Sequence, residues 1–116
     1  MANTFKNAFA ENVSNTSTPT NVLTSPTGNA SRCVLIGVQL TNTSSSEITA
    51  TISICDYSDT SNDIVFLNEV PIPANSMLSV LGGDKVILEE QDIVKVKSNT
   101  ASACNAFVNY LLIDNT

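Results

Sequence analysis

EITATISICDY, residues 47–57, alternates apolar and polar side chains along its length. The apolar members share one face of an extended chain, and they are Ile48, Ala50, Ile52 and Ile54. Alternation with period two is typical of a β-strand that buries one face. This stretch therefore predicts a strand with its isoleucines in a core.

The preceding stretch, SRCVLIGVQLTN at residues 31–42, shows the same period. The polar residues 43–46 between the two stretches predict a short turn. The two strands therefore form either an antiparallel pair or a connection between two sheets. The apolar side chains assigned to the core face of residues 31–42 are Val34, Ile36, Val38 and Leu40.

Further extended stretches flank this pair. Residues 76–81 and 85–88 surround Gly82, Gly83 and Asp84 and predict a hairpin. Pro71 and Pro73 cannot donate to a ladder and predict an edge strand or a crossing between sheets. The remaining predicted strands are residues 20–24, 64–70, 93–97 and 103–113.

About eight short strands with almost no helical periodicity predict an all-β fold. Their spacing is typical of a single antiparallel two-sheet β-sandwich, of immunoglobulin-like or jelly-roll type. The length of 116 residues fits one domain. Asn, Ser and Thr together occupy 41 positions, so neutral polar side chains make up much of the surface.

Residues 1–19 depart from the strand pattern. Phe5, Phe9 and Val13 are spaced four apart, which places them on one face if the segment forms a short helix. We therefore divide the chain into an N-terminal arm, residues 1–19, and a β-sandwich domain, residues 20–116. Two interpretations of the arm stay open: it caps one open end of the sandwich, or it anchors the protein on a neighbouring subunit, because exposed Phe side chains are otherwise costly.

Charge and hydropathy exclude nucleic acid as a partner and a helix that spans a membrane. The net charge is −6 and only five residues are Lys or Arg, so no basic stripe is present to neutralise nucleic-acid phosphates. No apolar run approaches the roughly 18 residues that span a bilayer. The first residues also lack the apolar stretch of a secretory signal, which predicts synthesis in a cytoplasm.

The residue inventory disfavours catalysis. Histidine is absent, which removes the usual general base near neutral pH and the commonest zinc ligand. Cys33, Cys55 and Cys104 are widely spaced and are expected to be free, mostly buried thiols. The sequence predicts no enzyme activity and no cofactor.

One polar loop offers oxygen ligands. Asp56, Asp59, Asn62 and Asp63 contain the oxygen atoms that calcium prefers, but their spacing does not match the helix-loop-helix calcium motif. A loop kept soluble by charge explains the same residues. The sequence leaves open which interpretation holds.

Five runs stand in an order that is shared with a known family. They are MANTFK at residues 1–6, VLIGVQLTNT at 34–43, VPIPANS at 70–76, LGGDK at 81–85 and DIVKVKS at 92–98. In this order, over nearly the whole chain, they resemble small virion structural proteins of tailed bacteriophages, especially marine ones.

The resemblance implies a small β-sandwich attached to the phage particle, with no catalytic residues. It implies capsid decoration or cementing, through contacts with the major capsid protein or other virion proteins. Such proteins commonly form homo-oligomers, and a trimer is favoured here. The alternative that the resemblance allows is a tail- or fibre-associated structural or adhesin module that contacts the host surface. In both cases the protein is located in the virion after synthesis in the host cytoplasm.

Overall fold

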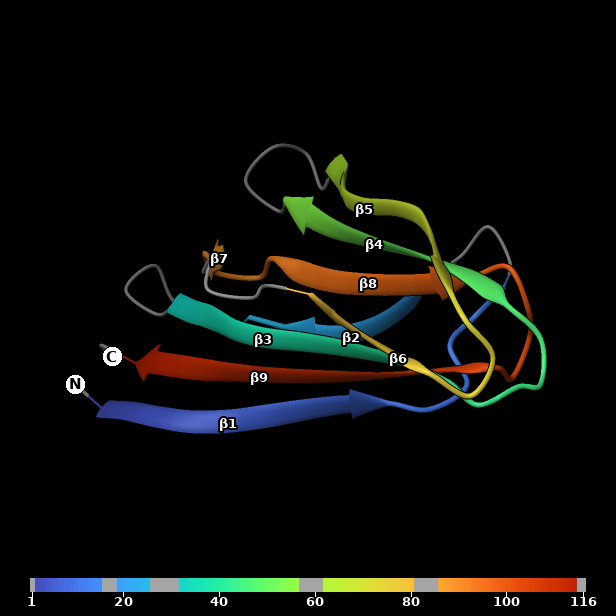
Figure 1. The fold of residues 1–116 in the computed structure, drawn as a ribbon. Coiled ribbons are helices and arrows are strands. Elements are labelled where there is room, and N and C mark those ends of the chain that lie inside the picture. The colour runs from blue at the N-terminus through green and yellow to red at the C-terminus, as the bar shows by residue number, and fades with distance from the viewer. Residues whose placement is uncertain (1, 16–18, 26–31, 57–61, 81–85, 115–116) are drawn as a thin grey trace.

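The protein is an all-β sandwich of two antiparallel sheets (Figure 1). The computed structural model describes residues 2–15, 19–25, 32–56, 62–80 and 86–114. These residues form nine strands and confirm the predicted fold class. The strands are β1 (Ala2–Ala10), β2 (Thr20–Thr24), β3 (Arg32–Asn42), β4 (Ile48–Asp56), β5 (Asn62–Ile72), β6 (Met77–Val80), β7 (Val86–Leu88), β8 (Ile93–Ser98) and β9 (Cys104–Asp114).

Sheet A contains β1, β9 and β3 in that order, with both β6 and β7 on the outer edge of β3. Sheet B has the order β2, β8, β4, β5. Strands β3 and β4 therefore lie in different sheets, which settles the open question in favour of a connection between sheets. The molecule measures 46 × 28 × 21 Å along its principal axes.

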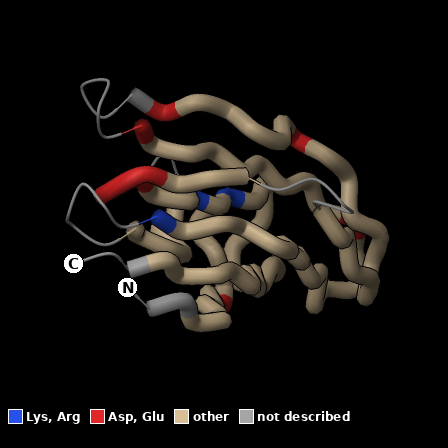
Figure 2. Tube along the Cα trace, turned by 90° about the vertical axis from the view of Figure 1, so that its left-hand side faces the viewer, with Lys and Arg blue, Asp and Glu red and all other residues tan. Residues whose placement is uncertain are grey.

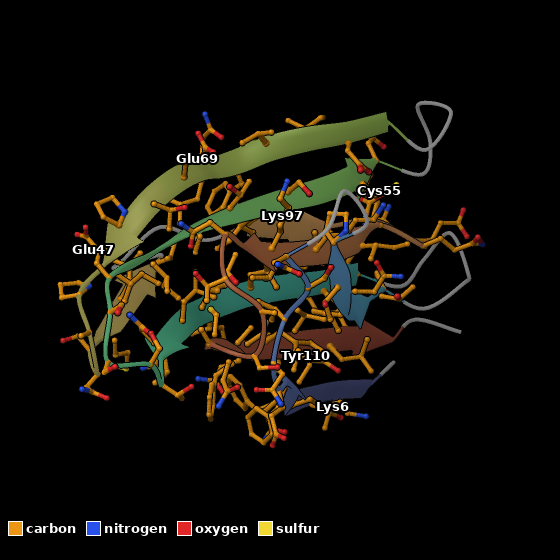
Figure 3. All side chains as sticks on the ribbon, turned by 90° about the vertical axis from the view of Figure 1, so that its right-hand side faces the viewer. Lys6, Glu47, Cys55, Glu69, Lys97 and Tyr110 are labelled. Carbon is orange, nitrogen blue, oxygen red and sulfur yellow. The ribbon has the colours of Figure 1, made fainter. Side chains whose placement is uncertain are left out.

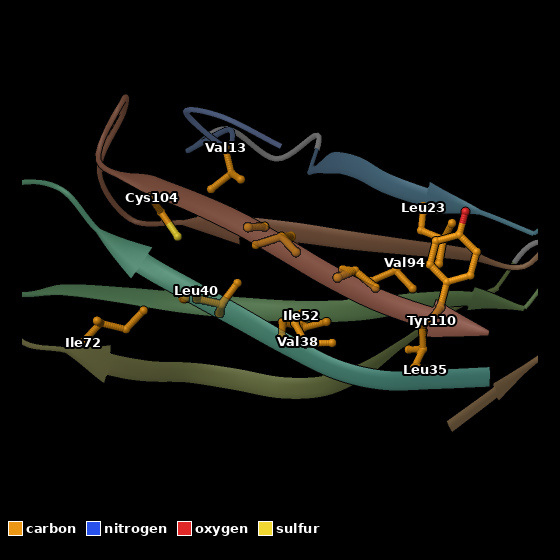
Figure 4. Close-up of a cluster of buried hydrophobic side chains, with 14 of the residues drawn as sticks. Val13, Leu23, Leu35, Val38, Leu40, Ile52, Ile72, Val94, Cys104 and Tyr110 are labelled. Carbon is orange, nitrogen blue, oxygen red and sulfur yellow. The ribbon is translucent and has the colours of Figure 1, made fainter. Parts of the chain in front are cut away.

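The core lies between the two sheets, where the inward side chains of each strand meet (Figure 4). Its largest fully buried apolar side chains are Leu35, Leu40, Ile48, Ile52, Ile72 and Leu88, with Val13, Val38, Val94, Val96 and Val108. Burying a Val, Leu or Ile side chain stabilises a fold by about 1.5 to 3 kcal/mol. This apolar layer is what holds the two sheets together.

A bulge in β3 changes which residues face the core. The pairing of β3 with β9 shifts register between Leu35 and Gly37. Because a bulge inserts one extra residue, the inward phase moves from odd to even positions. Val38 and Leu40 are buried as predicted, whereas Ile36 is exposed and Val34 is only half-buried, so that part of the assignment is wrong.

Strand β4 changes phase in the same way. Its pairing with β5 shifts register on both sides of Ile52. Beyond that point Ser53 and Cys55 are buried, whereas Ile54 is only half-buried. The predicted inward face therefore holds for Ile48, Ala50 and Ile52 and not for Ile54.

The predicted hairpin after Ser76 is wrong. Strands β6 and β7 do not pair with each other in the described residues; both pair with β3, β6 opposite Val38–Thr41 and β7 opposite Cys33–Leu35. The two short strands run in the same direction along one edge. The glycine-containing turn at residues 81–85 lies outside the described residues.

Residues 2–10 form a strand and not a helix. Strand β1 pairs with β9 over nine consecutive positions, from Ala2 opposite Asp114 to Ala10 opposite Ala106. A spacing of four residues equals two strand periods as well as about one helical turn, so the Phe pattern fits both structures. The predicted helical face is wrong, because β9 offers a long edge on which residues 2–10 satisfy their backbone groups.

Asn42 ties the crossing from β3 to β4 onto the end of β5. Its buried side chain donates from Nδ2 to the carbonyl oxygens of Ser46 at 2.8 Å, Ile72 at 3.1 Å and Pro73 at 3.1 Å. Its Oδ1 accepts from the backbone N–H of Ser44 at 2.9 Å and from the Ser44 hydroxyl at 2.7 Å. One side chain therefore satisfies the polar groups of a turn that is folded against the core.

Candidate interaction face

The outer face of sheet A carries exposed aromatic side chains. On β1, Phe5 and Phe9 leave 77% and 62% of their surface exposed. Phe9 stands directly opposite Phe107 of β9, and the two rings pack at a tilt with their centroids 5.0 Å apart. Alternation along both strands puts Phe5, Phe9 and Phe107 on the solvent side of the sheet, because the alternate residues, among them the buried Ala106 and Val108, turn inward.

The apolar surface continues across the sheet. Phe5 pairs with Leu111, Leu111 pairs with Val34, and Val34 pairs with Ile87, so these four form a row over β1, β9, β3 and β7. We define the face A patch as the apolar residues on the outer side of sheet A. They are Phe5, Phe9, Val34, Ile36, Met77, Ile87, Phe107 and Leu111.

A hollow interrupts the face A patch. Asn7, Asn109 and Gly37 stand side by side on β1, β9 and β3, between the row that contains Phe5 and the row that contains Phe9. Nothing lies within 4 Å of a Cβ built on Gly37, so this spot is open. The hollow has a volume of about 410 Å³, and its lining comprises Phe5, Lys6, Asn7, Ile36, Asn109 and Tyr110.

The face has few charges. The strands of sheet A contain two cationic residues, Lys6 and Arg32, and one acidic residue, Asp114 at the end of β9. Arg32 forms an ion pair with Glu89 at 3.7 Å. Little charge therefore has to be desolvated when an apolar partner covers the patch.

The structure separates the three predicted anchoring residues. Phe5 and Phe9 lie together on the face A patch, as an anchoring role requires. Val13 is only 1% exposed, its N–H donates to the carbonyl of Cys104 at 2.9 Å, and it packs in the core (Figure 4). Val13 is therefore not available to a partner, because the chain turns inward after β1.

Sequence reasoning missed most of the face A patch. Phe107, Leu111 and Ile87 come from strands far apart in the chain, and only the pairing order brings them beside Phe5. The alternation within residues 103–113 could have placed Phe107 and Leu111 on a common face. Nothing in the sequence showed that β1 completes that face.

A second exposed apolar group lies on β5. Ile64, Val65 and Phe66 are consecutive, and 53%, 56% and 38% of their surfaces are exposed. Consecutive strand residues point to opposite faces, so both sides of β5 are apolar here. The preceding residue, Asp63, forms an ion pair with Lys95, with 3.2 Å between Oδ1 and Nζ.

The thiols are buried and poorly suited to chemistry. Cys33, Cys55 and Cys104 are all buried free thiols, as predicted. Burial raises the pKa of each, and that of Cys104 reaches about 11. A thiol with a raised pKa is a weak nucleophile at neutral pH, because little of it is thiolate.

Alkaline pH is expected to destabilise the fold through Cys104. The thiol ionises near its ordinary value of 9.0 in the unfolded chain and at about 11 in the folded one. The stability that it contributes is therefore complete below pH 9 and is lost as the pH rises from 9 to 11, a difference of about 2 to 3 kcal/mol. Urea unfolding over that pH range measures it, and Cys104→Ala should flatten the slope. An unchanged slope in Cys104→Ala would contradict this assignment.

The described residues show no metal centre. No group of three or more Cys, Asp or Glu side chains is placed to hold an ion in the described ranges. In the predicted oxygen-rich loop, Asp56 and Asp63 lie near the ends of β4 and β5, and Asp59 lies outside the described residues. No helix in the described part of the chain could cross a membrane.

Comparison with known proteins gives a fold match only. No family model and no curated protein sequence matches the chain. A chain from the Bacillus endospore appendages, described as disulfide-linked pili, superposes with a TM-score of 0.57 at 10% identity, covering 98% of this chain and 89% of that one. It therefore shares the fold of this protein.

Two weaker matches have TM-scores below 0.5. A chain from a virus-like particle of the extra small virus of the prawn Macrobrachium rosenbergii has a TM-score of 0.39 at 9% identity, covering 100% of this chain and 82% of its own. Xylanase 10B of Clostridium thermocellum, in its CBM22-1 and GH10 modules, has a TM-score of 0.37 at 11% identity, covering 98% of this chain and 26% of its own.

Proposed function

We propose that this protein is a non-enzymatic structural component of a phage virion that decorates or cements the capsid shell. The observation that carries the proposal is the face A patch. Monomeric proteins rarely leave several neighbouring aromatic and aliphatic side chains uncovered, and such patches mark interaction sites. Phe5 and Phe9 are its most exposed aromatic residues and act as the anchors.

The chemistry of the chain supports an assembly role. The sequence contains no histidine, and its thiols are buried with raised pKa values. An add-on to a shell needs a rigid core and an adhesive surface, and it does not need a tuned catalytic group. The apolar core and the face A patch supply those two properties.

The Bacillus match is compatible with assembly but suggests a different linkage. That protein belongs to disulfide-linked pili. In this chain the exposed fractions of Cys33, Cys55 and Cys104 are 0%, 4% and 0%. A disulfide between subunits would require the sandwich to open, so we propose that contacts between subunits are non-covalent.

Co-sedimentation with particles of the encoding phage tests the proposal. The double variant Phe5→Ser/Phe9→Ser should bind at least about a hundredfold more weakly, because two anchoring rings contribute about 1.5 kcal/mol or more each. Ala101→Ser, in the exposed turn before β9, is the matched control and should bind like the native chain. Equal binding by the Phe double variant and the native chain would refute the anchoring role.

A second candidate is a tail- or fibre-associated adhesin that contacts the host. The hollow favours it, because the Asn7 and Asn109 amides and the Phe5 ring are a combination that suits a sugar. Tyr110 lines the hollow but is only 9% exposed, so it presents no open aromatic platform, and Tyr57 lies outside the described residues.

A bulky side chain beside the hollow separates the two candidates. Gly37 does not line the hollow but pairs with Asn109, which does, and Gly37→Leu should fold normally, because its Cβ meets nothing within 4 Å. If the protein is an adhesin, glycan-array binding by the native chain should disappear in Gly37→Leu. Absence of glycan binding by the native chain would exclude this candidate and leave the shell proposal.

A further inference from the structure

Two long strands have unpaired outer edges. In the described part of the chain, β1 pairs only with β9 and β5 pairs only with β4, so each leaves one edge without a partner strand. They have nine and eleven residues. A free edge presents a row of N–H and C=O groups that can pair with another chain. Figure 1 places β5 and β1 at opposite sides of the molecule.

The beginning of β5 is an exposed apolar edge. Residues 62–65 pair in regular register with β4, a register shift follows at Phe66, and Ile64, Val65 and Phe66 are exposed. Farther along the strand the register shifts again between Leu67 and Val70, and Pro71 lacks an N–H, so that part disfavours pairing. The exposed apolar edge at residues 62–65 therefore favours strand addition.

The charges select the partner. Asp63 and Glu69 are the charged residues of β5, and Lys6 is the charged residue of β1. In Figure 2, β5 is the uppermost strand and carries red acidic positions. Figure 3 shows Glu69 and Lys6 at opposite sides of the molecule. Pairing two β5 strands would bring carboxylates together, whereas pairing β5 with β1 brings opposite charges together.

We propose that the β5 edge of one copy adds to the β1 edge of a second copy of this chain. The contact is head-to-tail, so it does not end at two copies; it closes into a ring, such as a trimer, or extends into a row. It uses the backbone edge of β1 and leaves the Phe5 and Phe9 side chains on the outer face. The proposal therefore goes beyond shell docking and does not depend on it.

Light scattering of the full chain at low salt, over a range of concentrations, tests this contact. The native chain should exceed the mass of a dimer as concentration rises. Val65→Lys and Ile64→Lys each place a charge on the exposed apolar edge and should abolish association, while Ala101→Lys is the matched control outside it. Circular dichroism shows which variants are folded. If one of the two edge variants does not fold, the other still tests the contact.

Charge reversal tests the choice of partner strand. Lys6→Glu and Asp63→Lys should each weaken association by roughly five-fold, and the double variant should restore it, because the opposite charges return and Asp63 lies in the regularly paired start of β5. Three results would overturn the proposal: a native monomer at every concentration, association that stops at a dimer, or single reversals that have no effect. Particle binding by Phe5→Ser/Phe9→Ser is measured separately, so failure of one proposal does not decide the other.

Discussion

Asn42→Ala is expected to lower the free energy of unfolding by about 3 to 5 kcal/mol, because each buried polar group that loses its partner costs about 1 to 3 kcal/mol. The variant removes the donor to the carbonyls of Ser46, Ile72 and Pro73. It also removes the acceptor for the Ser44 N–H and hydroxyl. Urea unfolding followed by circular dichroism measures the change.

Ser44→Ala is the matched control for Asn42→Ala. It deletes one hydroxyl and leaves the three Asn42 donations in place, so it should cost only about 1 kcal/mol. Equal losses in the two variants would show that the Asn42 side chain does not hold the crossing to β5. In that case the stability of this end of the sandwich must come from apolar packing alone.

Deleting residues 1–14 is expected to destabilise the whole sandwich, with a loss of several kcal/mol. The deletion removes the nine paired positions of β1 and the buried Val13, whose side chain alone contributes about 1.5 kcal/mol or more. It also uncovers the edge of β9 beside Ala106 and Val108. Since about 1 kcal/mol shifts Tm by several degrees in a domain of this size, we expect Tm to fall by more than about 10 °C.

The deletion also tests the division of the chain into an arm and a domain. A detachable arm over residues 1–19 would leave Tm unchanged when it is removed. An integral first strand would lower Tm as described. Phe5→Ser/Phe9→Ser is the comparison, because it alters the same segment at exposed positions and should leave Tm nearly unchanged.

The sequence predicted the sandwich because alternation marks a strand wherever one face is buried. It predicted less well which side chains of a strand face the core, because a bulge exchanges the inward and outward positions and the sequence does not mark where the bulge lies. In β3 the Ile36 side chain looks like a core residue by type and points outward because the register shifts before Gly37. Residue type alone does not reveal where a second strand forces an extra residue into the ladder.

Long-range pairing also explains the other misses. Gly82 and Gly83 favour a local hairpin, yet β6 and β7 both pair with the longer strand β3. The face A patch depends on the same kind of information, because it forms only when β1, β9, β3 and β7 lie side by side. Phe5 and Phe9 were identified from sequence through their spacing, and Phe107 was missed because its partner strand was interpreted as an arm.

Site-specific photocrosslinking in assembled phage particles tests the central claim most directly. A photoreactive phenylalanine at position 5 or 9 should crosslink to the major capsid protein, while one at the exposed turn residue Ala101 should not. Crosslinks to the shell from Ala101 alone, or none from positions 5 and 9 in particles that contain the protein, would contradict docking through the outer face of sheet A.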